Sequence, residues 1–276
     1  MTKKLKLLLV LIIVPLLFSF NCGETKSVEQ GKDNKTDLTP KKDSPVKDSI
    51  KKPLDKMQIL VNAYPDFIEK AENNKIYWKD GTTMIYDDGK NKTYDDLLEN
   101  PDIEDMLSQE YVLGADWDVP PAKNFEPGRF RNEPFFEKMY GASKSAVTSN
   151  LTTINWFGTS VQVSTVNGVD EQFKLVMKEL DKLPAEFHKY FNKTAGTFNY
   201  RKIAGTDRYS AHSYGIAIDI NTSYSDYWQW DKSMTYKNKI PIEVVEVFEK
   251  YGFVWGGKWY HYDTMHFEFR PELIIK

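Results

Sequence analysis

Two short segments near the C-terminal end of the chain constrain its fold more than any other feature. The first runs from Ser210 to Asp219 and the second from Asp263 to Glu268. Two of the four histidines lie in these segments, each with an acidic residue at a short offset. Two imidazoles, one carboxylate ligand and a further acidic residue are the groups of a mononuclear zinc site with a general base. A fold that brings the two segments together is therefore expected.

The first segment is expected to form a turn followed by a strand. Between residues 214 and 221, isoleucines alternate with Ala217, Asp219 and Asn221, which is typical of a strand with one buried face. Asp219 therefore projects away from the core, toward an open cleft. The turn at 213–215 can bring His212 back over the same face.

The second segment is expected to be a strand over residues 265–270. Its apolar residues face the core, so His266 and Glu268 share the opposite face. Asp263 comes three residues before His266, at the entry to the strand. The spacing alone leaves two interpretations open. One is a metal site on a cleft, and the other is structural histidines with carboxylates that cap or line a solvated edge.

The remaining periodicity predicts a small antiparallel sheet flanked by helices, which is an α+β class of fold. We expect helices at 57–71, interrupted at Tyr64-Pro65, at 94–111, broken at Pro101, and at 134–140, 169–183 and 241–251. We expect strands at 76–78, 83–86, 161–166, 194–201, 214–221, 254–255 and 265–270. The stretch 125–131 is expected to be a loop.

Residues 1–22 have the layout of a secretory signal. A basic start is followed by an uncharged apolar run, 7–18, that is shorter than the ~20 residues needed to span a bilayer. The single cysteine, Cys22, follows that run and resembles the lipid attachment site of bacterial lipoproteins. The alternative is an ordinary signal peptide with an incidental cysteine. Export to the periplasm or cell envelope is expected in both cases, and a membrane anchor in the first.

Residues 23–56 are expected to form a disordered tether, because their charged and Pro/Ser/Thr-rich composition offers too little apolar surface to fold. A tether of roughly 30 residues has a reach of about 30 Å. Folded sequence is expected in an N-terminal part, 57–158, which is integral to the body or a separate lobe, and in a core, 159–276. The formal net charge of -3 gives no support to a nucleic-acid partner.

The two motifs together resemble the zinc peptidases that act on bacterial cell-wall peptides. The resemblance rests on Ser210, His212, Gly215, Ala217 and Asp219, on the stretch Trp255-Gly256-Gly257 with Trp259, and on Asp263-x-Met265-His266-Phe267-Glu268. The family includes the VanY-type D-alanyl-D-alanine carboxypeptidases and the L-alanyl-D-glutamate endopeptidases of phage endolysins. The resemblance covers residues 161–272 and implies a zinc site in a cleft on the sheet, in a Hedgehog/D-Ala-D-Ala peptidase-like fold.

The resemblance also implies a role for each motif residue. His212, Asp219 and His266 fall at the positions of the zinc ligands, and Asp263 falls where the family keeps its catalytic acid/base. The VanY-like branch usually has Glu at that position, whereas the endopeptidase branch has Asp. Arg201 lies just upstream of the first motif, where the family places an arginine that binds substrate and stabilises the oxyanion.

Four further residues near the motifs are candidates for substrate contact or ligand support. Trp255 and Trp259 are expected to wall the cleft, where Gly256-Gly257 allows a close backbone approach. Ser210 is a candidate substrate-binding residue. A role as a nucleophile is not supported, because no His–Asp pair outside the metal set is available to activate it. Glu268 is either an orienting partner of a ligand or a surface carboxylate.

The remaining histidines and two tryptophans have weaker signals. His261 is expected at the rim of the site, with a substrate contact as the alternative. His188 has no acidic partner in register and is expected to be structural. Trp228 and Trp230 are expected to belong to an aromatic core, or else to stack on a glycan.

Two functions from different classes follow. The first is an exported zinc peptidase that hydrolyses an amide bond in peptidoglycan stem peptides, and the second is a non-catalytic, zinc-containing module that binds the cell wall. Asp263 and Arg201 favour the enzyme, because a structural metal site needs neither residue. A protease acting on proteins remains a third option, and the choice between carboxypeptidase and endopeptidase stays open at this point.

Overall fold

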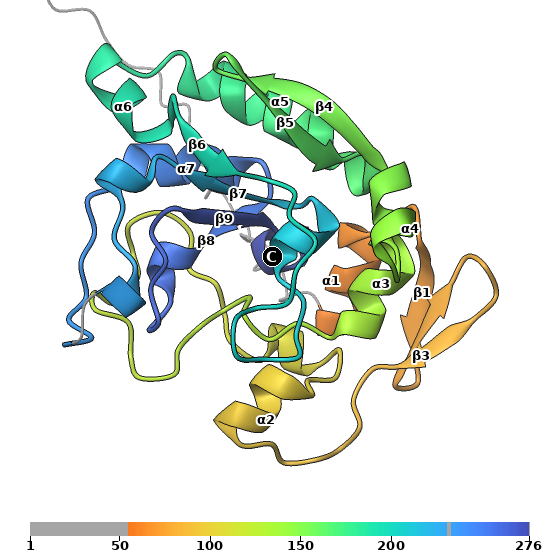
Figure 1. Cartoon of the computed structure of the whole chain (residues 1–276). Coiled ribbons are helices and arrows are strands. Elements are labelled where there is room, and N and C mark those ends of the chain that lie inside the picture. The colour runs from red at the N-terminus through yellow and green to blue at the C-terminus, as the bar shows by residue number, and fades with distance from the viewer. Residues whose placement is uncertain (1–54, 231–232, 276) are drawn as a thin grey trace, which may run out of the picture. The chain divides into compact units, whose positions relative to one another are not determined.

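The computed structural model describes residues 55–230 and 233–275 (Figure 1). Residues 1–54 lie outside the described residues, and with them the predicted signal peptide, Cys22 and nearly all of the predicted tether. The described part combines helices with small antiparallel sheets, which confirms the predicted α+β class. None of its helices is both long enough and apolar enough to cross a membrane.

The sheet that carries the two motifs has four antiparallel strands in the order β6-β7-β9-β8. The first motif supplies β7 and the second supplies β9, which are neighbours in the sheet (Figure 1). The strands are β6 (Thr194–Gly196), β7 (Ala217–Ile220), β8 (Phe253–Trp255) and β9 (His266–Phe269). The predicted strands 194–201 and 214–221 are both shorter in the structure. The second starts later than predicted because residues 211–214 form a 3-10 turn.

The register of β7 against β9 separates a polar face from an apolar face. Asp219 lies opposite His266, and Ile218 lies opposite Phe267. Directly opposed residues of an antiparallel pair project from the same face of the sheet. Asp219 and His266 therefore share one face, as the alternation in the sequence predicted, and Ile218 and Phe267 share the other.

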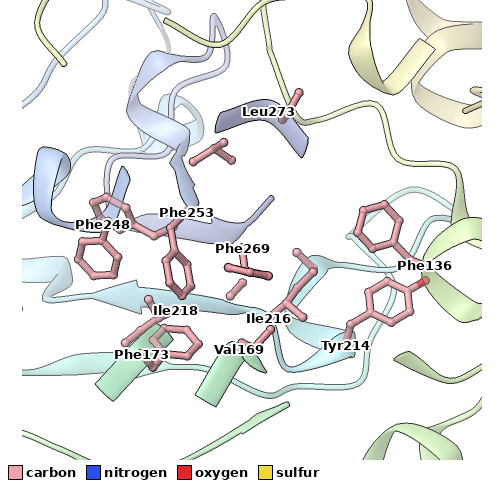
Figure 2. Close-up of a cluster of buried hydrophobic side chains, with 14 of the residues drawn as sticks. Phe136, Val169, Phe173, Tyr214, Ile216, Ile218, Phe248, Phe253, Phe269 and Leu273 are labelled. Atoms are coloured by element: carbon pink, nitrogen blue, oxygen red, sulfur yellow. The ribbon is translucent and has the colours of Figure 1, made fainter. Parts of the chain in front are cut away.

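Two amphipathic helices, α5 (Val169–Leu180) and α7 (Ile242–Lys250), pack near the apolar face of this sheet. The ring of Phe173 on α5 lies 4.6 Å from that of Phe253, centroid to centroid. The ring of Phe248 on α7 stacks on Phe267 with 3.9 Å between the centroids. Figure 2 shows several of these rings in one buried cluster with Ile218. Fully burying such a side chain stabilises the fold by roughly 1.5–3 kcal/mol, which makes this cluster the support of the motif strands.

The first predicted helix is shorter than expected, and a three-stranded antiparallel meander, β1-β2-β3, begins within its predicted range. Helix α1 (Lys56–Ala63) ends before Pro65, and β1 (Ile68–Glu72) then pairs with β2 (Lys75–Trp78). The turn between the strands is Asn73-Asn74, with φ of 53° and 60°. Asparagine tolerates this left-handed conformation, which tight hairpin turns require. The helix predicted over 57–71 is therefore wrong beyond Ala63.

The other predicted elements are present with shifted ends, but the structure adds one strand and three short helices, at 144–149, 188–191 and 271–274, that were not among the expected elements. Strand β4 was not expected; it forms a hairpin with β5, which covers most of the predicted strand 161–166. The predicted helix 94–111 is reduced to α2 and a 3-10 turn at 105–107, on either side of Pro101. The remaining bounds are β3 (Thr83–Ile85), β4 (Leu151–Trp156), β5 (Thr159–Ser164), α2 (Tyr94–Glu99), α3 (Glu133–Tyr140), α4 (Lys144–Ser149), α6 (His188–Phe191) and α8 (Pro271–Ile274).

Buried hydrogen bonds tie the N-terminal residues to the C-terminal part. The hydroxyl of Tyr111 donates to Glu249 at 2.7 Å, and the ammonium of Lys258 donates to the same carboxylate at 2.6 Å. Lys258 is 2% exposed and also donates to the carbonyls of Val112 and Gly114. This buried ammonium has a partner for each of its three N–H groups, as burial of a charge demands.

Candidate metal centre

A capped turn delivers His212 to the polar face of the sheet. The 3-10 turn at 211–214 begins at Ser210, whose hydroxyl accepts a hydrogen bond from the backbone N–H of His212. Gly215 then leads into β7 with a φ of 70°. This φ favours glycine, and a Cβ atom there would also lie only 3.1 Å from the backbone nitrogen of Ser164.

Three side-chain atoms converge in a nearly equilateral triangle. Nε2 of His212 lies 3.2 Å from Oδ1 of Asp219 and 3.2 Å from Nδ1 of His266. Nδ1 of His266 lies 3.1 Å from the same Asp219 oxygen. Zinc with ligand bonds of about 2.0–2.1 Å separates the ligand atoms of a tetrahedral site by about 3.3–3.4 Å. The triangle therefore fits a zinc ion that keeps its fourth position open, and the three residues could hold a metal.

Each histidine is oriented by a hydrogen bond from its other ring nitrogen. Nδ1 of His212 faces the carbonyl oxygen of Thr197, which only accepts, so Nε2 is left with its lone pair. Nε2 of His266 lies 3.0 Å from a carboxylate oxygen of Glu268, so Nδ1 is the free nitrogen. Such partners fix the tautomer and the ring plane of a metal-binding histidine. The two histidines thus offer different nitrogens to the same point.

The electrostatics of the triangle favour a positive charge at its centre. Burial opposes the charged forms, but the facing imidazoles hold the pKa of Asp219 well below its usual range. Burial likewise opposes the charged form of His266, yet hydrogen bonds with Asp219 and Glu268 raise its pKa to about 10. A divalent cation would satisfy the same demand for positive charge.

Asp263 stands beside the triangle without being part of it. Its backbone N–H donates to the carbonyl oxygen of Gly256 at 2.9 Å, which fixes its position at the entry to β9. Its Oδ1 atom is buried and makes no hydrogen bond to the described residues. Burial, followed by the charge of Asp219, raises the pKa of Asp263 to about 6. An unengaged carboxylate oxygen at this place is a candidate to exchange a proton with substrate or water.

A cavity of about 310 Å³ opens over the triangle and gathers most of the predicted site residues. Arg201 contributes an exposed side chain to its lining and has no ion pair among the described residues. Ser210 and Trp259 also line it. The predicted residues on the lining are Arg201, Ser210, His212, Asp219, Trp259, Asp263, His266 and Glu268.

Trp255 does not line this cavity, so the prediction that it walls the cleft is wrong. It lies opposite Phe267 in the β8–β9 register and therefore shares the core face. The side chain is 1% exposed, and its indole N–H donates to the carbonyl oxygen of Thr264 at 2.9 Å. The motif Trp255-Gly256-Gly257-x-Trp259 thus divides between the core and the cavity.

Glu268 is fully buried, which excludes the alternative of a surface carboxylate. Besides His266, it contacts Arg131 at 3.2 Å and Arg270 at 2.9 Å. These two guanidinium groups and His266 hold the pKa of Glu268 well below its usual range, against the effect of burial. Glu268 therefore stays ionised and can keep the ring of His266 oriented, as predicted for an orienting partner.

Arg270 extends this network through Glu272 to Tyr64, the residue that follows α1. It is fully buried, and its Nε donates to Glu272 at 2.5 Å. The other oxygen of Glu272 accepts from the hydroxyl of Tyr64 at 2.6 Å. Glu268 and Glu272 are both buried, and Arg270 is the cationic partner that they share, which offsets part of the cost of their burial.

Replacing Arg270 by methionine is expected to destabilise the protein by about 3–5 kcal/mol, because it leaves Glu268 and Glu272 buried without their shared partner. Equilibrium unfolding in urea measures the change. Lys174→Met removes an exposed partner of Asp170 and serves as the control, for which little change is expected. Equal stability losses in the two variants would contradict the role given to Arg270.

The weaker predictions have mixed outcomes. His261 lines the cavity, as expected of a rim residue, and His188 hydrogen-bonds the carbonyl oxygen of Leu183 away from it, as expected of a structural one. Trp228 lines the cavity and Trp230 is 60% exposed, so their assignment to the core is wrong.

Sequence reasoning missed the cavity residues that come from the loop 125–131. Arg129 and Arg131 both line the cavity, although they lie more than 70 residues before the first motif. The available signal was weak: a Pro-Gly loop that carries one glutamate and two arginines.

Residues 204–269 match the family model described as D-alanyl-D-alanine carboxypeptidase. The match spans both motifs and the three atoms of the triangle, and it confirms the resemblance predicted from the motifs. Arg201 and the loop 125–131 lie outside the matched residues. The curated proteins and the solved structures contain no match to the chain.

Proposed function

We propose, from the family match over residues 204–269, that this protein is a zinc-dependent peptidase that hydrolyses an amide bond in peptidoglycan stem peptides. The observation that carries the proposal is the triangle of His212, Asp219 and His266 with Asp263 beside it, in one cavity. The bond belongs either to a D-alanyl-D-alanine terminus or to an L-alanyl-D-glutamate link. The Hedgehog/D-Ala-D-Ala peptidase-like fold forms part of the same proposal.

The residues of the cavity divide the work of amide hydrolysis. His212, Asp219 and His266 would hold the zinc ion, which when bound would supply a Lewis acid for the scissile carbonyl and would lower the pKa of water to about 7. The free carboxylate oxygen of Asp263 takes the proton of the attacking water and returns it to the leaving amine. Arg201, whose guanidinium lies on the cavity lining without an ion pair among the described residues, stabilises the negative charge that develops on the carbonyl oxygen.

A non-catalytic, wall-binding module is the competing function. A structural metal site is closed by its ligands and needs no further acid. Here, however, the cavity leaves room above the triangle, and no described residue hydrogen-bonds the buried Oδ1 atom of Asp263. Both observations support a catalytic function over a binding module.

We propose that the protein works in the periplasm or cell envelope. The predicted signal over residues 1–22 supports export, and the position of Cys22 supports a lipid anchor in the membrane. A tether over 23–56 would then give the catalytic body a reach of about 30 Å toward the wall. The net charge of -3 gives no electrostatic support to a nucleic-acid partner.

Digestion of purified peptidoglycan with and without a zinc chelator tests this function. New amine ends are expected in the untreated sample, and they should disappear with chelator and return when zinc is added. Mass spectrometry of the muropeptides identifies the bond, because a carboxypeptidase releases single D-alanines and an endopeptidase splits the stem after L-alanine. Binding to the wall without cleavage would instead support the module.

A further inference from the structure

The loop 125–131 is hydrogen-bonded to residues 259–260, just before the second motif. The backbone N–H of Tyr260 donates to the carbonyl oxygen of Phe125, and the indole N–H of Trp259 donates to that of Pro127, both at 2.8 Å. A Cβ atom at Gly128 would lie 3.1 Å from Leu273, and its φ is 98°. These contacts fix the loop in place as part of the cavity wall, although it lies outside the residues that match the family model.

Glu126 of this loop is fully buried and serves two cavity side chains with its two oxygens. Oε1 accepts from the backbone N–H of His261 at 3.2 Å and is also the partner of Nδ1 of the same residue. Oε2 lies 2.7 Å from Nη1 of Arg129. A buried carboxylate is costly without such partners, so the three groups form one unit.

This unit directs two nitrogen donors into the cavity. With Nδ1 of His261 bound to Glu126, the free nitrogen of the ring is Nε2, and the ring packs against Trp228 with 4.6 Å between centroids. The guanidinium of Arg129 lies 5.5 Å from the ring centroid of Trp259. It has five N–H groups and faces Glu126 with one terminal nitrogen, so most of its donors are left for a ligand.

Two of the three acidic groups on the cavity lining have other partners, and the third, Asp263, forms no ion pair with Arg129 among the described residues. Asp219 faces both histidines of the triangle, and Glu268 is held by Arg131 and Arg270. Arg129 is 18% exposed on the lining and meets only Glu126 as an acidic partner among the described residues. The free donors of Arg129 and His261 are therefore suited to an incoming anion rather than to a group of this chain.

We infer that Glu126, Arg129 and His261 form a subsite that binds a carboxylate of the substrate next to the scissile bond. Arg129 and His261 donate to the carboxylate, and Glu126 positions both. This inference rests on the proposed function for the nature of the substrate. The carboxylate has two sources in stem peptides, a chain-terminal D-alanine or the free α-carboxylate of a D-glutamate residue.

Two matched pairs of peptides test the inference and separate the two sources. The first pair is diacetyl-L-lysyl-D-alanyl-D-alanine and its C-terminal amide. The second is an L-alanyl-γ-D-glutamyl peptide with its α-carboxylate free or amidated. The measurements are kcat/KM and, independently, binding of all four peptides followed by tryptophan fluorescence. The variants are Arg129→Gln, Arg129→Lys and the control Lys202→Gln, whose ammonium pairs with Asp207.

We expect the wild type to prefer the acid in one of the two pairs, in both measurements. Arg129→Gln should reduce that preference about 10- to 100-fold, which is typical of a lost charge-assisted hydrogen bond. Arg129→Lys should restore part of it, and Lys202→Gln should keep the wild-type ratio. Thermal unfolding of each variant verifies that it is folded. The acid-to-amide ratio is taken within one variant, so a loss of activity that affects both peptides equally does not change the ratio.

No preference for the acid in either pair, or an unchanged preference in Arg129→Gln, would overturn the inference. If the wild type hydrolyses neither pair, the proposed function fails, and the binding measurements then decide the subsite alone. A preference in binding that depends on Arg129 would support the subsite without the enzyme.

Discussion

His212→Ala is expected to lose both the metal and all measurable hydrolysis. The substitution removes one of three ligand atoms and leaves only Asp219 and His266 in the triangle. Removing even a supporting partner of a ligand typically costs about 10–100-fold in metal affinity, so the loss of a ligand should exceed about 100-fold. Zinc content after dialysis and the rate of muropeptide cleavage measure the two effects.

His188→Ala is the matched control, because His188 contacts the carbonyl oxygen of Leu183 and lies off the cavity lining. It should keep one zinc per chain and the wild-type rate. A His212→Ala protein that still holds zinc with wild-type affinity would show that the triangle is not the metal site. A wild-type protein that holds no zinc at all would lead to the same conclusion.

Asp263→Ala is expected to keep the metal and lose about 10²–10⁴-fold in kcat. General acid–base catalysis by a positioned side chain contributes about this factor. The metal stays because Asp263 contributes no atom to the triangle. Asp263→Asn should have nearly the same effect, because the amide fills the same space but cannot take a proton. Steady-state rates together with zinc content separate this result from that of His212→Ala.

Asp207→Ala removes an exposed carboxylate that pairs with Lys202 and provides the control for a change of charge alone. It should leave both rate and zinc content unchanged. Near-normal turnover in Asp263→Ala would remove Asp263 from the mechanism and would favour the module that only binds the wall.

The local pattern of the two motifs was enough to predict the faces of β7 and β9. Side chains alternate between the two faces along a strand. Asp219, His266 and Glu268 must therefore project from the face opposite the isoleucines and phenylalanines, which pack in the core. The same rule places Trp255 in the core, since it pairs with Phe267. That prediction was wrong because Trp255 was judged by its nearness to the motif and not by its register, which depends on a strand partner.

Contacts between distant residues account for most of what was missed. Glu126 and His261 are 135 positions apart, and Arg131 and Glu268 are 137 apart. No periodicity within one segment can indicate such pairs. The hairpin of β1 and β2 was missed for a related reason, because the strands have little alternation and the turn is Asn-Asn rather than a glycine turn.

The sequence by itself determined the α+β class, the family resemblance and the candidate ligands His212, Asp219 and His266, because these follow from residue types at short spacing. Only the tertiary structure decided that one nitrogen from each histidine meets one oxygen of Asp219, that Glu268 is buried between two arginines, and that a distant loop brings Arg129 to the cavity. Those arrangements depend on packing and on the pairing of buried charges across the chain, which short-range patterns do not encode.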